Sequence, residues 1–444
     1  MKTIFIAGAG RSSTTLISHL LENSDRHGLR VIVGDASLEL AVNKCNNHPN
    51  SIPTLFDVND AVLRNKLVSQ ADLVISLLPP DMHHLLVVEC LVHGKHFLSA
   101  SYVSAKVAAL EPQAREKGVV VISECGLDPG IDHMSAMEII NRLKSQGANL
   151  ISFKSYTGGL VAPESNDNPW GYKISWNPRN VILAGQGTAS YLWGGKFKHI
   201  PYSRIFTDIE TLEVDQIGRF DGYANRDSVS YLKIYGLEGI SGLLRGTLRQ
   251  RGYCRAWNVF VTLGLTDDVV RIPSSGSMTY AELVESFIPV HIKGETIAHR
   301  VASLCSLPVD GEAMTLVTWT GIFEDTLIGI ENATPAQILQ KLLESKWILN
   351  PEDRDMVVMI HEFIYDLNGE SRRLTSSLVV KGEDSVHTAM AKTVGLPLAI
   401  TALKLMDGSI SLPGGLYLPV TKEIYEPVLR DLEKHGVVFQ EKVS

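Results

Sequence analysis

Six short apolar runs, separated by stretches long enough to form helices, occupy the first 124 residues of the chain. Unbroken apolar runs of this length are typical of strands buried on both faces, and helix-length connections allow such strands to run parallel. The pattern predicts an α/β fold of the Rossmann type, a doubly wound parallel sheet. The expected strands are 3–7, 30–35, 51–56, 73–78, 96–101 and 119–124, and the expected crossover helices include 16–21, 60–69 and 107–117.

A chain of 444 residues exceeds what one hydrophobic core usually organises, so more than one domain is expected. After about residue 130 the rhythm changes, with a helix expected at 133–146 and a strand at 151–156. The pattern further on predicts mainly helix at 237–265, 277–307 and 335–345, strands at 315–323 and 355–366 with a hairpin partner at 372–382, and an apolar helix at 385–406 that returns to the first domain.

Composition excludes several classes of protein. The formal net charge of −8 argues against a nucleic-acid partner, which usually needs a basic face. The five cysteines are scattered and form no CxxC pair, so neither a disulfide framework nor a metal site is expected. No apolar run approaches the ~18 residues of a membrane span. We therefore expect a soluble cytoplasmic protein that binds no metal, nucleic acid or membrane.

The segment GAGRSS, residues 8–13, follows the first expected strand and opens a helix, which is the context of a dinucleotide-binding loop. Gly8 permits the tight turn, and Gly10 lets the backbone approach a pyrophosphate. Asp35, after the second strand, can accept hydrogen bonds from ribose hydroxyls and repels a 2′-phosphate, so NAD is expected rather than NADP. The alternative is that Asp35 serves only a turn or a helix N-cap. The expected cofactor-binding residues are Gly8, Gly10, Arg11, Ser12, Ser13, Asp35, Leu77, Leu78, Gly126 and Leu127.

Two polar segments, SASYVS at 99–104 and ECGLDPGIDHM at 124–134, directly follow apolar strands. Because ligands of such folds bind at the carboxyl ends of the strands, both are candidate substrate loops. Within them, Asp132 is expected to be the N-cap of the following helix, His133 to be structural and Cys125 to be a small buried residue. The adjacent His83 and His84 are expected to be exposed polar residues of a loop.

Five further segments carry a family resemblance. In chain order they are GLDPGIDH, GGLVAPESNDNPWGYKISWNPR, NRDS, RGTLR and AMAKTVGLP, and together they resemble saccharopine reductase, the glutamate-forming saccharopine dehydrogenase. The resemblance implies reversible hydride transfer at the secondary amine that joins a lysine-derived chain to glutamate, and a homodimer. It also implies a Rossmann domain at 1–129 with a return of about 386–444, an α/β domain at 130–225 and 313–385, and a mainly helical insert at 226–312.

Site residues follow from the same resemblance. Ser101, Tyr102 and Asp128 match positions beside the substrate amine, where Asp128 could accept a proton during imine hydrolysis. The matching substrate contacts in the later motifs are Arg226, Arg245 and Thr247. Independently of the resemblance, saccharopine carries three carboxylates, so its binding site should contain several positively charged side chains. Arginine is favoured because it binds a carboxylate with two hydrogen bonds. The further candidates on that ground are Lys173, Arg179 and Arg249.

Two positions depart from the family pattern. Thr157 stands where family members carry cysteine, so a thiol acid–base role is excluded there. Asp35 stands where fungal members carry an arginine suited to NADP. Two alternatives remain open: a dehydrogenase for another secondary amine, of the opine or carboxyspermidine type, and a catalytically silent NAD-binding protein.

Overall fold

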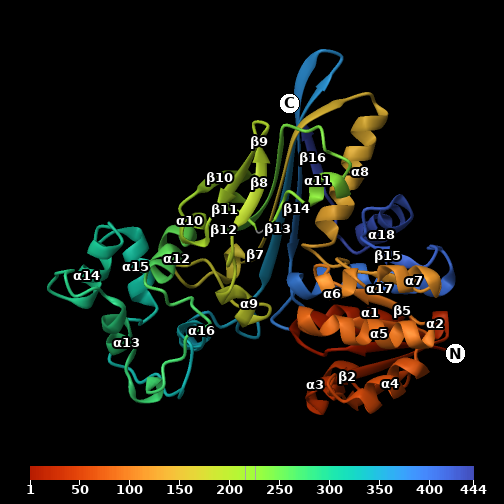
Figure 1. Cartoon of the computed structure of the whole chain (residues 1–444), viewed down its shortest axis with the longest axis horizontal. Coiled ribbons are helices and arrows are strands. Elements are labelled where there is room, and N and C mark those ends of the chain that lie inside the picture. Colours follow the sequence, from red (N-terminus) through yellow and green to blue (C-terminus); the bar gives the residue numbers. More distant parts are fainter. Residues whose placement is uncertain (216, 226) are drawn as a thin grey trace. The chain divides into compact units, whose positions relative to one another are not determined.

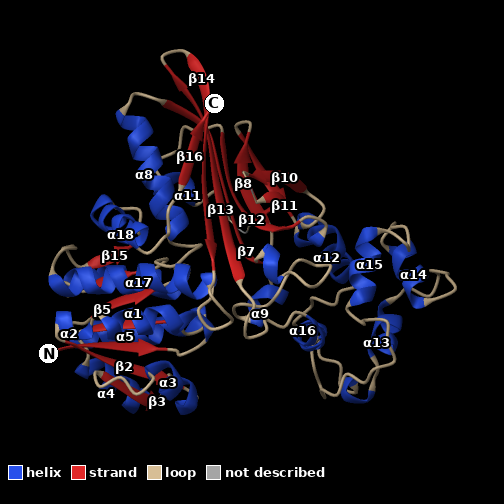
Figure 2. Cartoon of the chain, turned by 180° about the vertical axis from the view of Figure 1, so that it is seen from behind, coloured by secondary structure: helices blue, strands red, loops and turns tan. Residues whose placement is uncertain are grey.

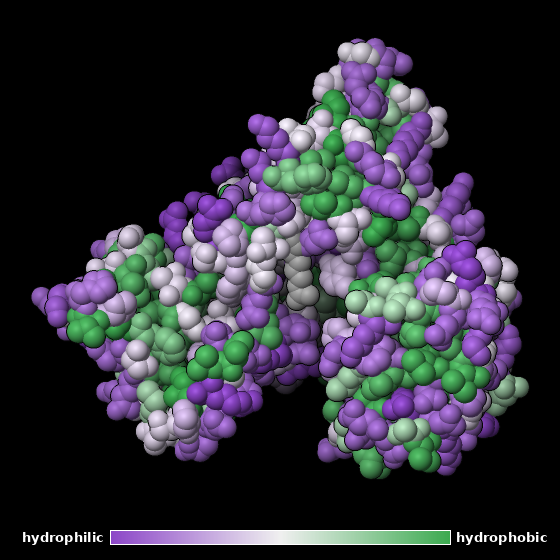
Figure 3. All heavy atoms as spheres, in the orientation of Figure 1, coloured by the Kyte–Doolittle hydropathy of each residue, from purple (hydrophilic) through white to green (hydrophobic). Residues whose placement is uncertain are grey.

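The computed structural model describes residues 1–215, 217–225 and 227–444, which form two compact units. Unit 1 comprises residues 1–149, 367–370 and 378–440, and unit 2 comprises 150–366, 371–377 and 441–444. Hydrophilic and hydrophobic residues are mixed on the face drawn in Figure 3. Each unit has its own buried core, as expected for a chain of this length.

Unit 1 is built on a seven-stranded parallel sheet with the strand order β15-β6-β5-β4-β1-β2-β3 (Figure 1). All six strands expected from the apolar runs are present, so the predicted Rossmann-type sheet is confirmed. The seventh strand comes from the C-terminal part of the chain. The strands are β1 (Lys2–Ala7), β2 (Leu29–Asp35), β3 (Ser51–Leu55), β4 (Leu73–Ser76), β5 (His96–Ser99), β6 (Val120–Ile122) and β15 (Gly415–Tyr417).

Helices connect these strands and bury their apolar faces on the sheet. Their starts follow local capping chemistry: the Asp60 carboxylate accepts from the amides of Val62 and Leu63, each at 3.0 Å. The helices of unit 1 are α1 (Thr14–Glu22), α2 (Ser24–His27), α3 (Leu38–Cys45), α4 (Ala61–Gln70), α5 (His83–His93), α6 (Ala105–Ala108), α7 (Glu111–Glu116), α8 (Ile131–Ser145), α17 (Ala389–Asp407) and α18 (Lys422–Lys434).

Helix α17 is long and apolar enough to cross a membrane by length and composition alone, but 78% of it is buried inside the protein. It packs against α1, the helix that follows the glycine loop. The approach is closest at Gly395, where an added Cβ would lie 2.6 Å from the backbone nitrogen of Leu16. Helix α17 is thus a core helix of unit 1, and a residue without a side chain sets its distance from α1.

Unit 2 contains most of a nine-stranded mixed sheet (Figure 2), whose main order is β10-β11-β12-β7-β13-β14-β16. Strands β7 and β12 run parallel in its middle, and the β8–β9 hairpin joins through β12. The strands are β7 (Asn149–Val161), β8 (Ala189–Trp193), β9 (Lys196–Ile200), β10 (Ile209–Val214), β11 (Gly218–Ala224), β12 (Gly242–Gln250), β13 (Asp355–Leu367), β14 (Glu370–Lys381) and β16 (Gln440–Val443).

Short helices complete unit 2. They are α9 (Pro178–Ile182), α10 (Tyr202–Ile205), α11 (Tyr231–Ile234), α12 (Tyr253–Thr262), α13 (Tyr280–Phe287), α14 (Ile297–Leu304), α15 (Glu312–Trp319) and α16 (Pro335–Lys346). The helices expected within 277–307 and at 335–345 are therefore present. A separate helical insert at 226–312 stays a prediction.

Two secondary-structure expectations were wrong. Within 237–265, expected to be helical, residues 242–250 form strand β12, which pairs with β7 on one side and β11 on the other. Within 315–323, expected to be a strand, α15 forms instead. Its β-branched residues suggested a strand, but Ala313, Met314 and Leu316–Val317 recur at helical spacing and are buried.

The segment GGLVAPESNDNPWGYKISWNPR contributes core as well as loop. Trp170 and Tyr172 are buried, and Trp170 stacks on Phe260 with ring centroids 5.8 Å apart. The indole nitrogen of Trp170 donates to the carbonyl oxygen of Leu316 at 2.8 Å. Trp170 thus packs in an aromatic core with Tyr253, Trp257 and Trp347.

Replacing Gly395 by alanine should push α17 away from α1 and destabilise unit 1 by about 1–3 kcal/mol, the usual cost of overpacking. Urea unfolding monitored by circular dichroism measures the effect. Gly239→Ala is the matched control, because an added Cβ there meets nothing within 4 Å. Equal stabilities of the two variants would contradict the packing role of Gly395.

Candidate active site

The carboxyl ends of four neighbouring strands, β6, β5, β4 and β1, carry the polar loops of unit 1. Because the strands are parallel, these ends lie at one edge of the sheet, where cofactors and substrates of such folds bind. The edge thereby brings together the glycine loop, Leu77–Leu78, Ser101–Tyr102 and the turn 124–130.

The glycine loop after β1 requires its first glycine. Gly8 has a φ of +110°, and an added Cβ would lie 3.2 Å from the carbonyl carbon and oxygen of Leu77. Its amide donates to the Gly34 oxygen at 2.8 Å, and the Leu77 amide donates to the Ala7 oxygen at 2.8 Å. Leu77 therefore lies directly beside the loop. Around Gly10, by contrast, an added Cβ would meet nothing within 4 Å, so the loop is open on that side.

The rest of the loop, Arg11–Ser13, is a single 3₁₀ turn that leads into α1. Ser13 stands where the dinucleotide fingerprint usually has glycine or alanine. It is buried, and its hydroxyl donates to the Gly10 oxygen at 2.7 Å. The hydroxyl is thus satisfied within the turn, so serine is accommodated there. Arg11 is exposed and Ser12 half-buried.

Asp35 at the end of β2 is engaged with the protein backbone. One carboxylate oxygen accepts from the Ala9 amide at 2.7 Å, and the other accepts from the Ser37 amide at 2.8 Å. The carboxylate therefore ties the glycine loop to the start of α3. Since these two hydrogen bonds give Asp35 a structural role, its presence alone is not sufficient evidence for NAD.

His83 was expected to be an exposed loop residue, but it is 2% exposed and lies at the start of α5. Its ring nitrogens contact the hydroxyls of Ser76 and Ser101, each at 2.8 Å, and so link the ends of β4 and β5. Burial lowers the pKa of His83 to about 4, with Asp81 opposing the shift. The available signal was its position directly after PPDM, at the edge of the sheet.

Tyr102 and Asp128 form a hydrogen-bonded pair at this edge. The Tyr102 hydroxyl donates to Asp128 Oδ1 at 3.0 Å, and both residues are half-buried. The turn that carries Asp128 is closed by the amide of Gly126, which donates to the Pro129 oxygen at 2.9 Å. Gly126 and Leu127 are buried in this turn, so they support its shape from within.

Glu124 is a second residue that sequence reasoning missed. It has a φ of +59° and is 4% exposed, directly after β6. One carboxylate oxygen accepts from the Val103 amide at 3.1 Å, and the other contacts His133 Nε2 at 2.9 Å. Glu124 thus connects the Ser101–Tyr102 loop with α8. An acid placed directly after a buried strand was the signal.

Two residues near Glu124, Asp132 and Cys125, were also assigned roles from the sequence. Gly130, not Asp132, is the N-cap of α8, although Asp132 Oδ1 accepts from the Gly130 amide at 2.6 Å. The expectation for Cys125 is confirmed: it is fully buried, and burial raises the pKa of its thiol to about 12.

In unit 2, one face of β12 carries Arg245, Thr247 and Arg249. The parallel register pairs Arg245 with Ser155 and Thr247 with Thr157, so β7 adds two hydroxyl residues to the same face. Thr157 is 6% exposed, and within the described part of the chain its hydroxyl has no hydrogen-bond partner. A buried hydroxyl of this kind usually meets a polar group of a ligand or a water.

The arginines of this face lie against aromatic rings. The Arg245 guanidinium is 4.1 Å from the ring of Tyr231, and its backbone amide donates to the Ser228 hydroxyl. Arg249 is 4% exposed and lies 5.5 Å from the rings of Tyr172 and Tyr253. Rings of this kind hold the guanidinium groups in place through cation–π contacts.

Other cation candidates are already paired. Lys173 contacts Asp167 at 2.8 Å and Asp353 at 2.7 Å, and Arg179 pairs with Asp268. Carboxylates within unit 2 therefore balance the charges of Lys173 and Arg179, although Nη1 of Arg179 is buried without a hydrogen-bond partner among the described residues. Arg226 lies outside the described residues.

The glycines beside Arg245 and Tyr223 make room for packing on the other face of the sheet. An added Cβ at Gly246 would lie 2.2 Å from the Tyr156 ring, on the face opposite to Arg245. At Gly222 it would lie 2.6 Å from Leu212 and 3.0 Å from the Tyr156 ring.

Unit 1 as a whole defines a Rossmann-type dinucleotide-binding domain, with the hydrogen-bonded Tyr102–Asp128 pair at the carboxyl edge of its sheet. Within residues 1–215, 217–225 and 227–444, no group of three or more His, Cys, Asp or Glu residues could hold a metal ion. The protein class indicated is an oxidoreductase that uses a nicotinamide cofactor.

Two family descriptions match almost the whole chain: "Saccharopine dehydrogenase NADP binding domain" at residues 4–122 and "Saccharopine dehydrogenase C-terminal domain" at 126–437. The chain belongs to the saccharopine dehydrogenase family.

Relatives agree with this assignment. The chain is 35% identical over 99% of its length to alpha-aminoadipic semialdehyde synthase, mitochondrial, of Mus musculus, and spans about half (47%) of that longer protein. It is 32% identical to saccharopine dehydrogenase [NADP(+), L-glutamate-forming] of Pyricularia oryzae, with 100% of this chain and 99% of that protein covered. The crystal structure of apo saccharopine dehydrogenase (L-Glu forming) from Saccharomyces cerevisiae superposes with a TM-score of 0.88 at 30% identity, covering 100% of both chains.

The expected preference for NAD over NADP is corrected by these findings. The matching domain is described as NADP-binding, and the fungal relative of the same length is named for NADP(+). The physical reason lies in Asp35, whose two oxygens accept from Ala9 and Ser37. Asp35 after β2 therefore has a structural role in the loop, and an acid at this position is not sufficient evidence for NAD.

Because His83 is neutral in the fold, acid should destabilise unit 1 through it. Its pKa is depressed from 6.5 to about 4, so the unfolded chain binds more protons, and stability falls as the pH drops from about 6.5 to 4. The full loss is about 3 kcal/mol. Urea unfolding of His83→Gln should show a correspondingly smaller decrease between these pH values.

The exposed His291 offers the control His291→Gln, which should follow the wild-type pH dependence. If His83→Gln lost as much stability as the wild type between pH 6.5 and 4, the neutral buried state of His83 would be excluded.

Proposed function

We propose that this chain interconverts saccharopine with glutamate and aminoadipate semialdehyde, using NADP(H). The observation that carries the proposal is the Tyr102–Asp128 pair, placed at the same sheet edge as the glycine loop. A reaction that combines hydride transfer with proton transfer needs both elements within one edge.

The residues of unit 1 fit a phosphorylated dinucleotide. Gly8–Ser13 leaves open space above Gly10 at the start of α1, where a pyrophosphate is favoured by backbone amides. Arg11 is the exposed cation of this loop, and Leu77, Leu78, Gly126 and Leu127 border the same edge. When bound, the nicotinamide accepts a hydride from the substrate carbon or returns it.

Asp128 is the proposed general base. In the oxidative direction the secondary amine loses its N–H proton as the neighbouring carbon loses hydride, which leaves a carbon–nitrogen double bond. Asp128 receives a proton from the amine or from the water that adds to the carbon. Once water has added to the carbon, protonation of nitrogen and loss of the proton from the new hydroxyl break the carbon–nitrogen single bond, so that glutamate and the aldehyde are released.

Tyr102 and Ser101 position this chemistry. The Tyr102 hydroxyl holds one oxygen of Asp128, and Ser101 is held by His83. The buried neutral imidazole fixes the Ser101 hydroxyl from behind. His83 therefore acts through Ser101 as a positioning residue.

Unit 2 supplies groups for substrate carboxylates. We assign this role to Arg245 and Thr247 on β12, with Arg226 as a further contact predicted from the family motif. Arginine suits such groups because its planar guanidinium binds carboxylates with two parallel hydrogen bonds. Thr157 on the same face is an additional hydrogen-bonding group, because its hydroxyl has no hydrogen-bond partner among the described residues. A homodimer and a cytoplasmic location stay predictions.

The proposal is tested by following the absorbance of the reduced nicotinamide while the protein oxidises saccharopine with NADP. We expect steady turnover, and slower turnover with NAD. Turnover only with another secondary-amine acid would assign a different substrate. Tight binding of NADP with no turnover on any such acid would indicate a catalytically silent protein.

Replacing Asp128 by asparagine removes the proposed proton acceptor while keeping the shape of the side chain. We expect kcat to fall by about 10²–10⁴-fold, the usual contribution of a general base. The affinity for NADP, measured by fluorescence titration, should stay within about twofold because the glycine loop is intact. The exposed Glu116→Gln is the control for loss of a carboxylate. An unchanged kcat in Asp128→Asn would remove this residue from the mechanism.

A further inference from the structure

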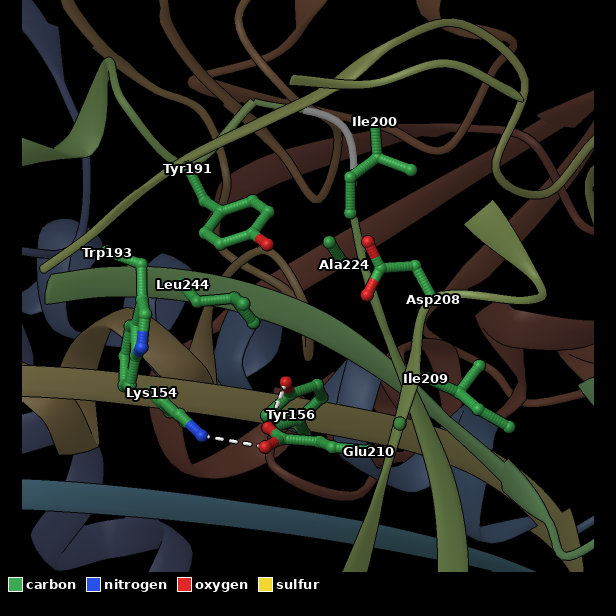
Figure 4. A pocket seen from close by; sticks show the side chains of 11 residues that line it. Lys154, Tyr156, Tyr191, Trp193, Ile200, Asp208, Ile209, Glu210, Ala224 and Leu244 are labelled. Carbon is green, nitrogen blue, oxygen red and sulfur yellow. Dashed lines mark hydrogen bonds and ion pairs between the residues drawn. The ribbon is translucent and has the colours of Figure 1, made fainter. Parts of the chain in front are cut away.

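A pocket in unit 2 lies on the face of the sheet opposite to Arg245 and Thr247. It encloses roughly 170 Å³ between β7, β10, β11, β12 and the β8–β9 hairpin (Figure 4). The strand registers pair Leu244 with Lys154 and Glu210 with Gly222, so these four residues share the pocket face. Arg245, Thr247 and Thr157 alternate with them and share the other face. The pocket is therefore separate from the proposed carboxylate-binding face.

The charges that line the pocket favour a cation. Lys154 Nζ contacts Glu210 Oε2 at 2.7 Å, and the Tyr156 hydroxyl donates to the other oxygen of Glu210. Glu210 is thereby balanced. Asp208 adds a second carboxylate, and its side chain has no ion pair or hydrogen bond within the described residues. With two carboxylates and one ammonium group, the lining carries one negative charge in excess.

The pocket walls favour a ligand with an apolar stem. Trp193 and Tyr191 stand on one side, and Leu244, Ala224 and Ile200 border the space between them and Asp208 (Figure 4). The Trp193 ring already carries an ammonium group, because Lys154 Nζ lies 4.6 Å from its centroid. Burial raises the pKa of Tyr191, with Asp208 adding to the shift, so its hydroxyl stays neutral and can donate a hydrogen bond.

We propose that this pocket binds a small organic cation: a primary ammonium group on a short aliphatic stem. The ammonium group pairs with Asp208 and lies near the Tyr191 ring, and the stem packs on Leu244, Ala224 and Ile200. A cavity of about 150 Å³ accommodates a molecule the size of benzene, so a stem of about four carbons fits the available volume. A tricarboxylate would be repelled by the excess negative charge, which distinguishes this ligand class from saccharopine.

The probe for the test is n-butylammonium chloride, with n-butanol and sodium butyrate as neutral and anionic analogues of the same length. Ligand-observed NMR on the full chain should show binding of n-butylammonium with a Kd on the order of 1 mM, as expected for so small a ligand. Binding of n-butanol should be weaker, and butyrate should not bind. Saccharopine should not displace the probe, since it would occupy the other face.

Two variants locate the binding. Asp208→Asn removes the unbalanced charge from an exposed side chain and should weaken n-butylammonium binding by about tenfold. Glu213→Gln on β10, the strand that begins directly after Asp208, is the matched control, because Glu213 pairs with Arg219 and does not line the pocket. It should leave the Kd unchanged. Ala224→Leu should fill the cavity and abolish binding, with circular dichroism checking the fold.

Equal binding of the three analogues would overturn the charge argument. Equal weakening by Asp208→Asn and Glu213→Gln would show that the probe responds only to net charge, and displacement of the probe by saccharopine would place it on the substrate face. Each of these results contradicts the proposal. If the wild-type protein did not oxidise saccharopine, the proposed function would fail, but the proposal for this pocket would stand, since the pocket does not depend on that reaction.

Discussion

The parallel direction of all seven strands is the constraint on which unit 1 depends. It requires each strand to be followed by a crossover, and it gathers the loops after β1, β4, β5 and β6 at one edge. Two buried side chains then connect neighbouring loops at this edge. His83 joins the ends of β4 and β5, and Glu124 joins the Ser101–Tyr102 loop to α8. The loops that carry the Tyr102–Asp128 pair are therefore held by two side chains that are almost fully buried.

In unit 2 the corresponding constraint is the alternation of side chains along β7 and β12. The same two strands present arginine and threonine on one face and Lys154, Tyr156 and Leu244 on the other. The Tyr156 ring occupies the space that a side chain at Gly246 would need. A glycine in the middle of the RGTLR motif is thus explained by packing on the far face. Any residue larger than glycine at position 246 would move the Tyr156 ring and disturb the strand that carries Arg245. Packing on one face of the sheet therefore affects the position of Arg245 on the other face.

Much of the fold could be predicted from the sequence. Every strand of the Rossmann sheet expected from an apolar run is present, because strands buried on both faces leave a pattern of length and hydrophobicity that few other structures share. Strand β12 and helix α15 could not be assigned in the same way. Both are short and partly polar, and for such segments tertiary packing outweighs local preference. The roles of Trp170 and Gly246 were equally hidden, because their partners Phe260 and Tyr156 lie far away in the sequence.

The candidate site shows where residue type alone misleads. Asp35 stands at the position of a ribose acceptor, yet each of its oxygens already accepts from a backbone amide. His83 belongs to a residue type that is often exposed, yet both its nitrogens contact buried or half-buried hydroxyls. In each case the function of the polar group depends on how its hydrogen bonds are satisfied, and sequence position does not reveal this. The same reasoning separates Lys173, which two carboxylates neutralise, from Arg249, which aromatic rings surround without neutralising it. Neutral rings leave the positive charge of Arg249 uncompensated. This charge attracts anions to its face of β12 and supports the assignment of that face to substrate carboxylates.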